Sequence, residues 1–121
     1  MGKRGLSEVT GNQYVTVCTG NAACLHRLTR RGREIADESG SALKILLLVR
    51  LAKRMHERAA LLEEAFQCAR QMDAEMNVYF TDRPMEKLMT DNSAWLVMRE
   101  GSGMTELVRR HMPDKRLVVM E

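Results

Sequence analysis

The sequence contains no long apolar run. No apolar stretch approaches the roughly 20 residues of a membrane-spanning helix, and the polar start Met1-Gly-Lys-Arg-Gly5 lacks the apolar segment of a signal peptide. We therefore expect a cytoplasmic protein without a membrane segment.

Metal ligands and catalytic signatures are also scarce. The three cysteines lack C-x-x-C spacing, and the three histidines share no ligand spacing with each other. These residues are Cys18, Cys24, Cys68, His26, His56 and His111. The chain has no G-x-S-x-G elbow, no Walker loop and no carboxylate pair in distinct environments. We expect reduced thiols, no metal site and no enzymatic activity.

Aromatic residues make up only 4% of the chain, whereas methionine occurs ten times. Methionine is unbranched and adaptable, so it can fill a core that has few rings. The methionines on expected apolar faces or strands are Met72, Met76, Met85, Met89, Met98, Met104 and Met120. We expect these side chains in the core, together with Trp95.

A strong excess of charge is absent as well. The 19 basic and 16 acidic residues give a net charge of +3, which is compatible with phosphate-bearing ligands and does not require nucleic acid. Basic residues gather at Arg27 to Arg33 and at Arg50 to Arg58. Each cluster is either a landing surface for an acidic partner or a solvated helix face, and we favour the solvated face.

The chain does show a repeated change in the spacing of its apolar residues. Short β-branched apolar runs alternate with amphipathic helical stretches. The expected strands are Tyr14 to Thr19, Ala42 to Val49, Met76 to Thr81, Ala94 to Met98 and Arg116 to Met120. Parallel neighbours need a helical crossover, so this alternation predicts one doubly wound parallel sheet. At 121 residues the chain is one domain. We assign residues 1–12 to a flexible lead-in and 13–121 to the domain.

Local signals place the helices. Asn21 is a good N-cap, Ser39-Gly40 ends the first helix, and Pro84 suits the first turn of the third. In the second helix, the apolar residues at helical spacing are Leu61, Leu62, Ala65, Phe66, Ala69 and Met72. We expect that face against the sheet.

Four segments together carry a resemblance to a known family. They are Val15-Thr-Val-Cys-Thr-Gly20, His26-Arg-Leu-Thr-Arg-Arg-Gly-Arg-Glu-Ile-Ala36, Leu61-Leu-Glu-Glu-Ala-Phe66 and Met98-Arg-Glu-Gly-Ser-Gly103. The first two resemble the opening of universal-stress-protein-like domains, the third resembles their second helix, and the fourth resembles their strand-four loop. The chain is most similar to the version in Kdp-type, potassium-responsive sensor histidine kinases. The likeness covers about residues 13–121. It implies strand order 3-2-1-4-5 in a Rossmann-like three-layer sandwich of the adenine-nucleotide alpha hydrolase type.

That order puts a ligand crevice between the first and fourth strands, at their carboxyl ends. The candidate ligand contacts are Thr19, Gly20 and Asn21 after the first strand, and Arg99, Gly101, Ser102 and Gly103 after the fourth. Both loops deliver backbone N–H groups at a helix N-terminus, which suits phosphate. The alternative is that the glycines only form turns.

The chain departs from the nucleotide-binding members of the family. Those carry a loop of the form G-x-x-G-x9-G-[ST] after strand four, and an acidic residue after strand one. Here no glycine follows Gly103, and Thr19-Gly20 stands after the first strand. We expect ATP binding to be weak or absent, with only weak nucleotide or phosphate binding. The cyclic dinucleotide bound by some Kdp-type domains is not supported either, because Thr19 to Cys24 is not serine-rich and Lys44 to Val49 is not aromatic.

The resemblance implies a non-catalytic regulatory or sensor domain in stress or osmotic and potassium signalling, with a sensor kinase or other signalling protein as partner. The alternative is a freestanding adenine-nucleotide-binding universal stress protein. Arg116 to Met120 should form an edge strand, and universal stress proteins commonly dimerise through their last strand, so we expect a homodimer. A monomer remains open, since Lys115, Arg116 and Glu121 could blunt that edge.

Overall fold

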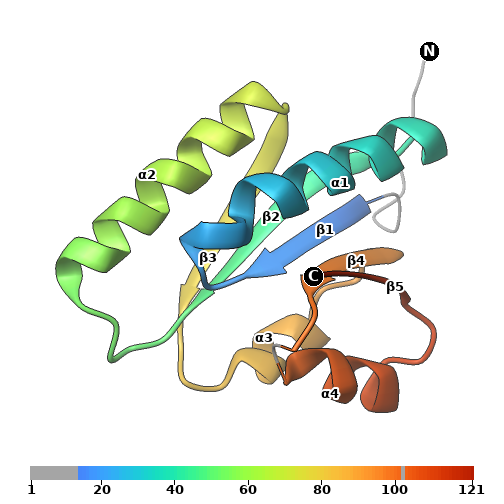
Figure 1. The fold of residues 1–121 in the computed structure, drawn as a ribbon. Coiled ribbons are helices and arrows are strands. Elements are labelled where there is room, and N and C mark those ends of the chain that lie inside the picture. The colour runs from blue at the N-terminus through green and yellow to red at the C-terminus, as the bar shows by residue number, and fades with distance from the viewer. Residues whose placement is uncertain (1–13, 102) are drawn as a thin grey trace.

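The computed structural model describes residues 14–101 and 103–121. The elements in chain order are β1 (Tyr14–Thr19), η1 (Ala22–Cys24), α1 (Leu25–Ser39), β2 (Ala42–Val49), α2 (Met55–Gln71), β3 (Ala74–Phe80), α3 (Pro84–Met89), β4 (Trp95–Arg99), α4 (Met104–His111) and β5 (Arg116–Met120). All five strands lie parallel in one sheet of order β3-β2-β1-β4-β5. Figure 1 shows α1 and α2 on one face of the sheet, with α3 and α4 on the other. The predicted fold class and strand order are confirmed.

The lead-in predicted for residues 1–12 lies outside the described residues. Within the described ranges, no helix combines the length and apolar character needed to cross a membrane.

Helix α1 lies closely against β1 and β2. Its side chains Leu28, Ile35 and Ala36 are buried against Val15 and Val17, which alternate onto this face of the sheet. The approach is close because the helix carries glycine at position 32. A Cβ atom on Gly32 would lie 2.5 Å from Val17 Cγ2 and 2.9 Å from Leu43 Cδ1. The predicted helix end is also confirmed, since Gly40 adopts the left-handed conformation (φ 70°) that closes many helices.

Helix α2 covers β2 and β3 on the same face. Leu61, Ala65 and Cys68 are buried against Ile45 and Leu47 of β2. On the opposite face, α3 and α4 cover a second layer of the core, in which the buried residues are Cys18, Leu46, Leu48, Leu88, Leu96, Met98 and Val108. The methionines of the expected set other than Met89 lie in these layers or pack against them.

A buried ionic cluster lies at the amino ends of the strands. Its centre is Asp91, a residue of the loop before β4. The Asp91 carboxylate lies 2.7 Å from Lys44 Nζ and 3.6 Å from Lys115 Nζ, and its side chain is only 4% exposed. Thr16 donates a hydrogen bond of 3.3 Å to Asp91 Oδ1, and the Ser93 hydroxyl donates to Oδ2. Lys115 also donates to the main-chain oxygens of Asp91 and Ser93. This Asp91 cluster links β1, β2 and the segments that enter β4 and β5.

The charges in this cluster stabilise one another. Burial alone would raise the pKa of Asp91, but hydrogen bonds from Lys44 and Ser93 and the charges of Lys44 and Lys115 lower it below its usual 3.8. Burial lowers the pKa of Lys115, and Asp91 opposes that change. Asp91 is therefore ionised at neutral pH.

The ladder between β1 and β4 joins two halves of the sheet, β3-β2-β1 and β4-β5, and it is short. β1 and β4 are in register only from Val15 with Trp95 to Val17 with Val97, whereas β1 and β2 are in register along all of β1. The remaining two ladders, β2–β3 and β4–β5, each lie within one half of the chain. The sheet is therefore joined at its centre by its shortest ladder.

Some sequence expectations are wrong in detail. The third strand begins at Ala74 and ends at Phe80, because Ala74 is in register with Leu43, near the start of β2. The fourth strand is displaced by one residue, to Trp95–Arg99. A 3₁₀ turn also separates the predicted N-cap, Asn21, from α1.

Two expected core residues are exposed instead. Phe66 is 58% exposed and Met89 57% exposed. Phe66 follows Arg58 by two steps of four residues along α2, and Arg58 lies over Phe80 of the edge strand β3. Phe66 is therefore on the side of α2 where the sheet offers no further strand to cover it. Met89 ends the six-residue helix α3, whose buried side chain is Leu88.

Candidate functional site

A crevice of about 700 Å³ opens at the carboxyl ends of the strands, where the prediction placed it. Ligand pockets commonly have volumes of several hundred Å³. The turn after β1 forms one wall (Cys18, Thr19, Gly20, Asn21, Cys24), the end of β2 and its loop a second (Leu48, Arg50, Ala52, Lys53, Glu57), and the end of β4 a third (Met98, Arg99, Glu100, Gly101, Met104). Thr81 and Pro84 complete the lining.

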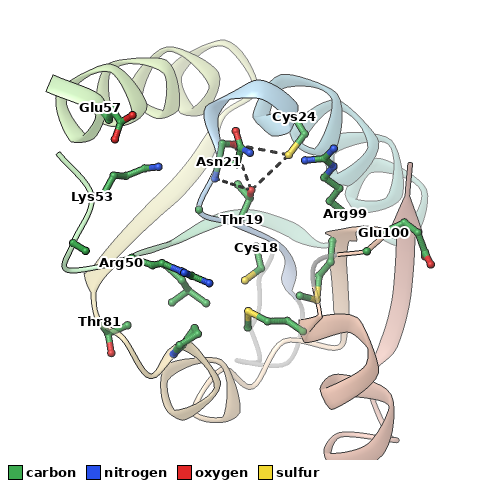
Figure 2. Close-up of a pocket in the computed structure, with 17 residues that line it drawn as sticks. Cys18, Thr19, Asn21, Cys24, Arg50, Lys53, Glu57, Thr81, Arg99 and Glu100 are labelled. Carbon is green, nitrogen blue, oxygen red and sulfur yellow. Dashed lines mark hydrogen bonds between the residues drawn. The ribbon is translucent and has the colours of Figure 1, made fainter. Parts of the chain in front are cut away.

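The turn after β1 is held by its own side chains. Asn21 N donates to Thr19 Oγ1 at 3.1 Å, and Ala23 N donates to Asn21 Oδ1 at 2.8 Å. The Cys24 thiol lies 3.6 Å from Thr19 Oγ1 and points toward Asn21 O at 3.8 Å (Figure 2). Asn21 thus caps the 3₁₀ turn η1, whereas the N-cap of the predicted helix, α1, is Cys24. The consequence for binding is that two of the N–H groups expected to face an anion already have acceptors within the turn.

Gly20 brings this turn down onto the end of β2. A Cβ atom at this position would lie 2.4 Å from Leu48 O. Only glycine permits the contact without displacing the main chain. The position of the β1 turn is therefore coupled to the backbone of β2.

The loop between β2 and α2 is held in a defined path. Arg58 folds back from α2: Nε donates to Lys53 O at 2.9 Å and Nη2 donates to Leu51 O. Its guanidinium also lies 5.0 Å from the ring centroid of Phe80. On the other side, Leu51 N donates to Asp82 Oδ1 at 3.2 Å. These contacts hold the segment that carries Arg50 and Lys53.

Three cations line the crevice: Arg50, Lys53 and Arg99. Figure 2 shows Arg50 and Lys53 extending from one side and Arg99 on the opposite side. Among the described residues, none of the three takes part in an ion pair. Of the two acids in the lining, Glu57 accepts a hydrogen bond of 3.4 Å from Arg54 N, and Glu100 points away from the opening. The crevice therefore presents a net positive charge.

The Cys18 thiol in the lining is chemically quiet. The side chain is 3% exposed, and burial, helped by the charge of Asp91, raises its pKa to about 12. It stays protonated at neutral pH, and only a thiolate is a strong nucleophile.

The structure brings most of the predicted site residues together. Thr19, Gly20, Asn21, Arg99 and Gly101 line the crevice, whereas Ser102 lies outside the described residues. Gly103 is not among the lining residues; it is the N-cap of α4, with φ 78°.

Arg50 and Lys53 were missing from the predicted contacts. Their position directly after β2, at the carboxyl edge of the sheet, was the available signal. In the other basic cluster, Arg31 pairs with Glu34 and Arg33 with Asp37 along α1. Arg33 also donates to Met72 O at 2.8 Å and Arg27 to Glu121 O at 2.6 Å, so only part of this cluster is a solvated face.

No protein-family model and no curated protein matches this sequence. Solved structures do match the fold. A universal stress protein from Archaeoglobus fulgidus has a TM-score of 0.64 at 14% identity, over 90% of this chain and 93% of that one. The universal stress protein from Archaeoglobus fulgidus in complex with dAMP has a TM-score of 0.64 at 13% identity, over 91% and 99%. A universal stress protein in complex with cAMP has a TM-score of 0.61 at 17% identity, over 93% and 99%.

The chain therefore has the α/β fold of universal stress proteins. This likeness does not bear on the association with Kdp-type sensor kinases, which stays a prediction from the sequence.

Proposed function

We propose that this protein is a non-catalytic regulatory protein of the universal stress type, which binds a ligand with a single phosphate, such as a nucleoside monophosphate, in the crevice. The observation that carries the proposal is the convergence of Arg50, Lys53 and Arg99 on one cavity without carboxylate partners among the described residues. A phosphate would supply the missing negative charge.

The comparisons support this choice of ligand and of protein type. Two proteins with the same fold were solved in complex with dAMP and cAMP, and both ligands carry one phosphate. This chain aligns with 93% and 99% of the length of the Archaeoglobus fulgidus proteins. These comparisons support our alternative, an adenine-nucleotide-binding universal stress protein, more than the sensor-kinase reading.

The cations, more than the backbone, would hold the phosphate. Asn21 N and Ala23 N are occupied within the β1 turn, so the charge must come from side chains on both sides of the opening. The chain also lacks the longer glycine loop of ATP-binding relatives. We accordingly expect ATP to bind no tighter than the high-micromolar range, at a binding free energy weaker than about 6 kcal/mol.

Binding without catalysis is supported by the lining itself. It contains no histidine, and Cys18 is held as a thiol. A general base and an activated nucleophile within reach of one another are the usual parts of a catalytic site. The described lining also includes Cys24, Glu57 and Glu100. The Cys24 thiol contacts Thr19 Oγ1 and Asn21 O within the β1 turn, Glu57 accepts a hydrogen bond from Arg54 N, and Glu100 points away from the opening.

Calorimetric titration with AMP, cAMP, ATP and inorganic phosphate tests the proposal. We expect AMP or cAMP to bind more tightly than ATP, with an affinity that falls as salt is added. Replacement of one cation at a time, as Arg50→Gln, Lys53→Gln or Arg99→Gln, should weaken binding by about tenfold, because each removes a charged hydrogen-bond donor. Arg30→Gln is the matched control, since Arg30 is exposed on α1 and is not part of the crevice lining.

Two results would overturn the proposal. One is the absence of binding by all four ligands at millimolar concentration. The other is an equal loss of affinity in Arg30→Gln and the crevice variants, which would show attraction to net charge alone.

A further inference from the structure

Strand β3 is an exposed edge of the sheet. It pairs with β2 only, among the described residues, and so presents a second row of main-chain groups to its open side. Its sequence, Ala-Glu-Met-Asn-Val-Tyr-Phe, contains no lysine, arginine or proline, the residues that commonly blunt an edge. Tyr79 and Phe80 are 39% and 43% exposed.

Helix α2 presents an apolar stripe beside this edge. The stripe consists of Met55, Ala59, Leu62, Phe66 and Ala69, which recur at helical spacing. Met55 is 77% exposed. Arg58 of α2 lies over Phe80 of β3, with its guanidinium 5.0 Å from the ring centroid, and Leu62 and Phe66 follow Arg58 at steps of four residues. The stripe therefore lies on the β3 side of the helix. Figure 1 shows α2 running alongside β3 at the outer side of the sheet.

The opposite edge, β5, is better protected. Val118 and Met120 pack against the layer under α1, and Leu117 packs against the layer under α4. Arg27 donates to Glu121 O at 2.6 Å beside the end of the strand. The exposed large apolar side chains of the described residues are Leu51, Met55, Phe66, Tyr79, Phe80 and Met89, and none belongs to β4, α4 or β5.

We propose that β3 pairs with β3 of a second copy of this chain, antiparallel about a two-fold axis through Asn77. Such pairing satisfies the open row of main-chain groups and extends the sheet across both copies. An axis perpendicular to the sheet leaves the two α2 helices on the same face.

The pairs on the α2 face fit this arrangement. With Asn77 opposite its own copy, Met76 lies opposite Val78 and Ala74 lies opposite Phe80 of the second copy. All four are apolar, and cross-strand apolar pairs stabilise antiparallel ladders. The two α2 stripes run antiparallel above these pairs, so Phe66 and Met55 can be covered by the same contact.

The pairs on the other face are polar, and a lysine of α3 lies beside them. Asn77 meets Asn77, where two amides can exchange hydrogen bonds, and Glu75 lies opposite Tyr79 of the second copy. Lys87 of α3 stands over Tyr79, with Nζ 5.1 Å from the ring centroid. The arrangement therefore places Lys87 of one copy near Glu75 of the other. Within one copy, Glu75 accepts a hydrogen bond of 2.6 Å from the Tyr14 hydroxyl and has no ion pair among the described residues.

Light scattering coupled to size exclusion tests the pairing across a range of protein concentrations. Wild type should give the mass of two chains. Asn77→Lys puts two like charges opposite each other at the axis and should raise the dimer dissociation constant at least tenfold. Val119→Lys introduces the same charge on β5 and should leave the dimer intact. Circular dichroism of each variant checks that it is folded.

Two further pairs of variants sharpen the result. Phe66→Glu puts a charge on the α2 stripe and should weaken the dimer, whereas Gln67→Glu places the same charge on the neighbouring position outside it. Glu75→Lys should weaken the dimer, and adding Lys87→Glu should restore it by exchanging the two charges.

Several outcomes would overturn the proposal. A wild-type protein that stays a single chain at the highest concentration rules out self-pairing and leaves the edge to another protein's strand. A dimer split by Val119→Lys and not by Asn77→Lys assigns the interface to β5. A dimer that survives Asn77→Lys and Phe66→Glu equally does not use this surface.

Discussion

The two ends of the parallel sheet handle charge in opposite ways. At the amino ends, Asp91 is buried between Lys44 and Lys115. At the carboxyl ends, Arg50 and Lys53 line an open crevice without an ion pair among the described residues. Charges that meet inside the protein stabilise its fold, whereas cations left to face a cavity attract a ligand. The difference predicts that substitutions at one end change stability, and those at the other change binding.

The largest effect is expected at the amino ends. Asp91→Ala leaves two lysines in a partly buried site without their acid, and it should lower the free energy of unfolding by about 3–5 kcal/mol. Urea denaturation measures the change. Asp82→Ala is the control at the carboxyl end, where the exposed side chain accepts one hydrogen bond from Leu51 N, and it should cost about 1 kcal/mol or less. Equal losses in the two variants would contradict the contrast.

Substitution of Gly20 tests whether stability and ligand binding are coupled at the carboxyl ends of the strands. Gly20→Ala forces a Cβ atom to within 2.4 Å of Leu48 O unless the β1 turn moves. We expect a loss of about 1–3 kcal/mol in the free energy of unfolding, as for other overpacked positions, and a weaker affinity for AMP. At Gly101, no atom lies within 4 Å of an added Cβ but φ is +79°, so Gly101→Ala should cost about 1 kcal/mol. A Gly20→Ala protein with unchanged stability and affinity would contradict this prediction, because it would show that the β1 turn moves without cost.

Acid should lower the free energy of unfolding by protonating Asp91, and by less than the Asp91→Ala substitution does. The pKa of Asp91 in the folded protein lies below its usual 3.8, so the contribution of its charge is fully present above that value. It is lost as the pH falls through the lower, folded-state pKa. Denaturant titrations of wild type and Asp91→Asn between about pH 2 and pH 5 should therefore converge at the acid end. Curves that stay parallel throughout would contradict this assignment.

The smallest change in stability is expected for the crevice cations. Arg99 is exposed and unpaired among the described residues, so Arg99→Gln should change the free energy of unfolding by no more than about 0.5 kcal/mol. Its affinity for AMP should still fall by about tenfold. A large loss of stability in this variant would mean that Arg99 supports the fold and would remove it from the proposed binding set.

Periodicity predicted the architecture well, because each strand and helix carries its pattern locally. The first, second and fifth strands have the predicted bounds. Asn21 is a cap, although of the 3₁₀ turn η1 and not of the first helix itself. The pattern failed where burial depends on distant neighbours. Phe66 has helical spacing with core residues, but it is exposed because no strand lies beyond β3.

Side-chain partners at long sequence separation were the least predictable part. Lys44 is a polar residue in an apolar strand, and nothing nearby in the sequence shows that Asp91 neutralises it. The role of Arg50 and Lys53 depends on the loop path, which Arg58 fixes through main-chain oxygens. Main-chain contacts of this kind leave no mark in the pattern of residue types.

The short ladder between β1 and β4 has a consequence for the lifetime of the folded state. It joins two halves that are each contiguous in the chain, and the crevice lies at the carboxyl ends of these same two strands. If unfolding begins by parting the halves, a ligand held between the β1 turn and Arg99 must be released first. Bound ligand should then slow the unfolding rate itself as well as shift the equilibrium. A cell could in this way read ligand concentration as the time for which the protein persists.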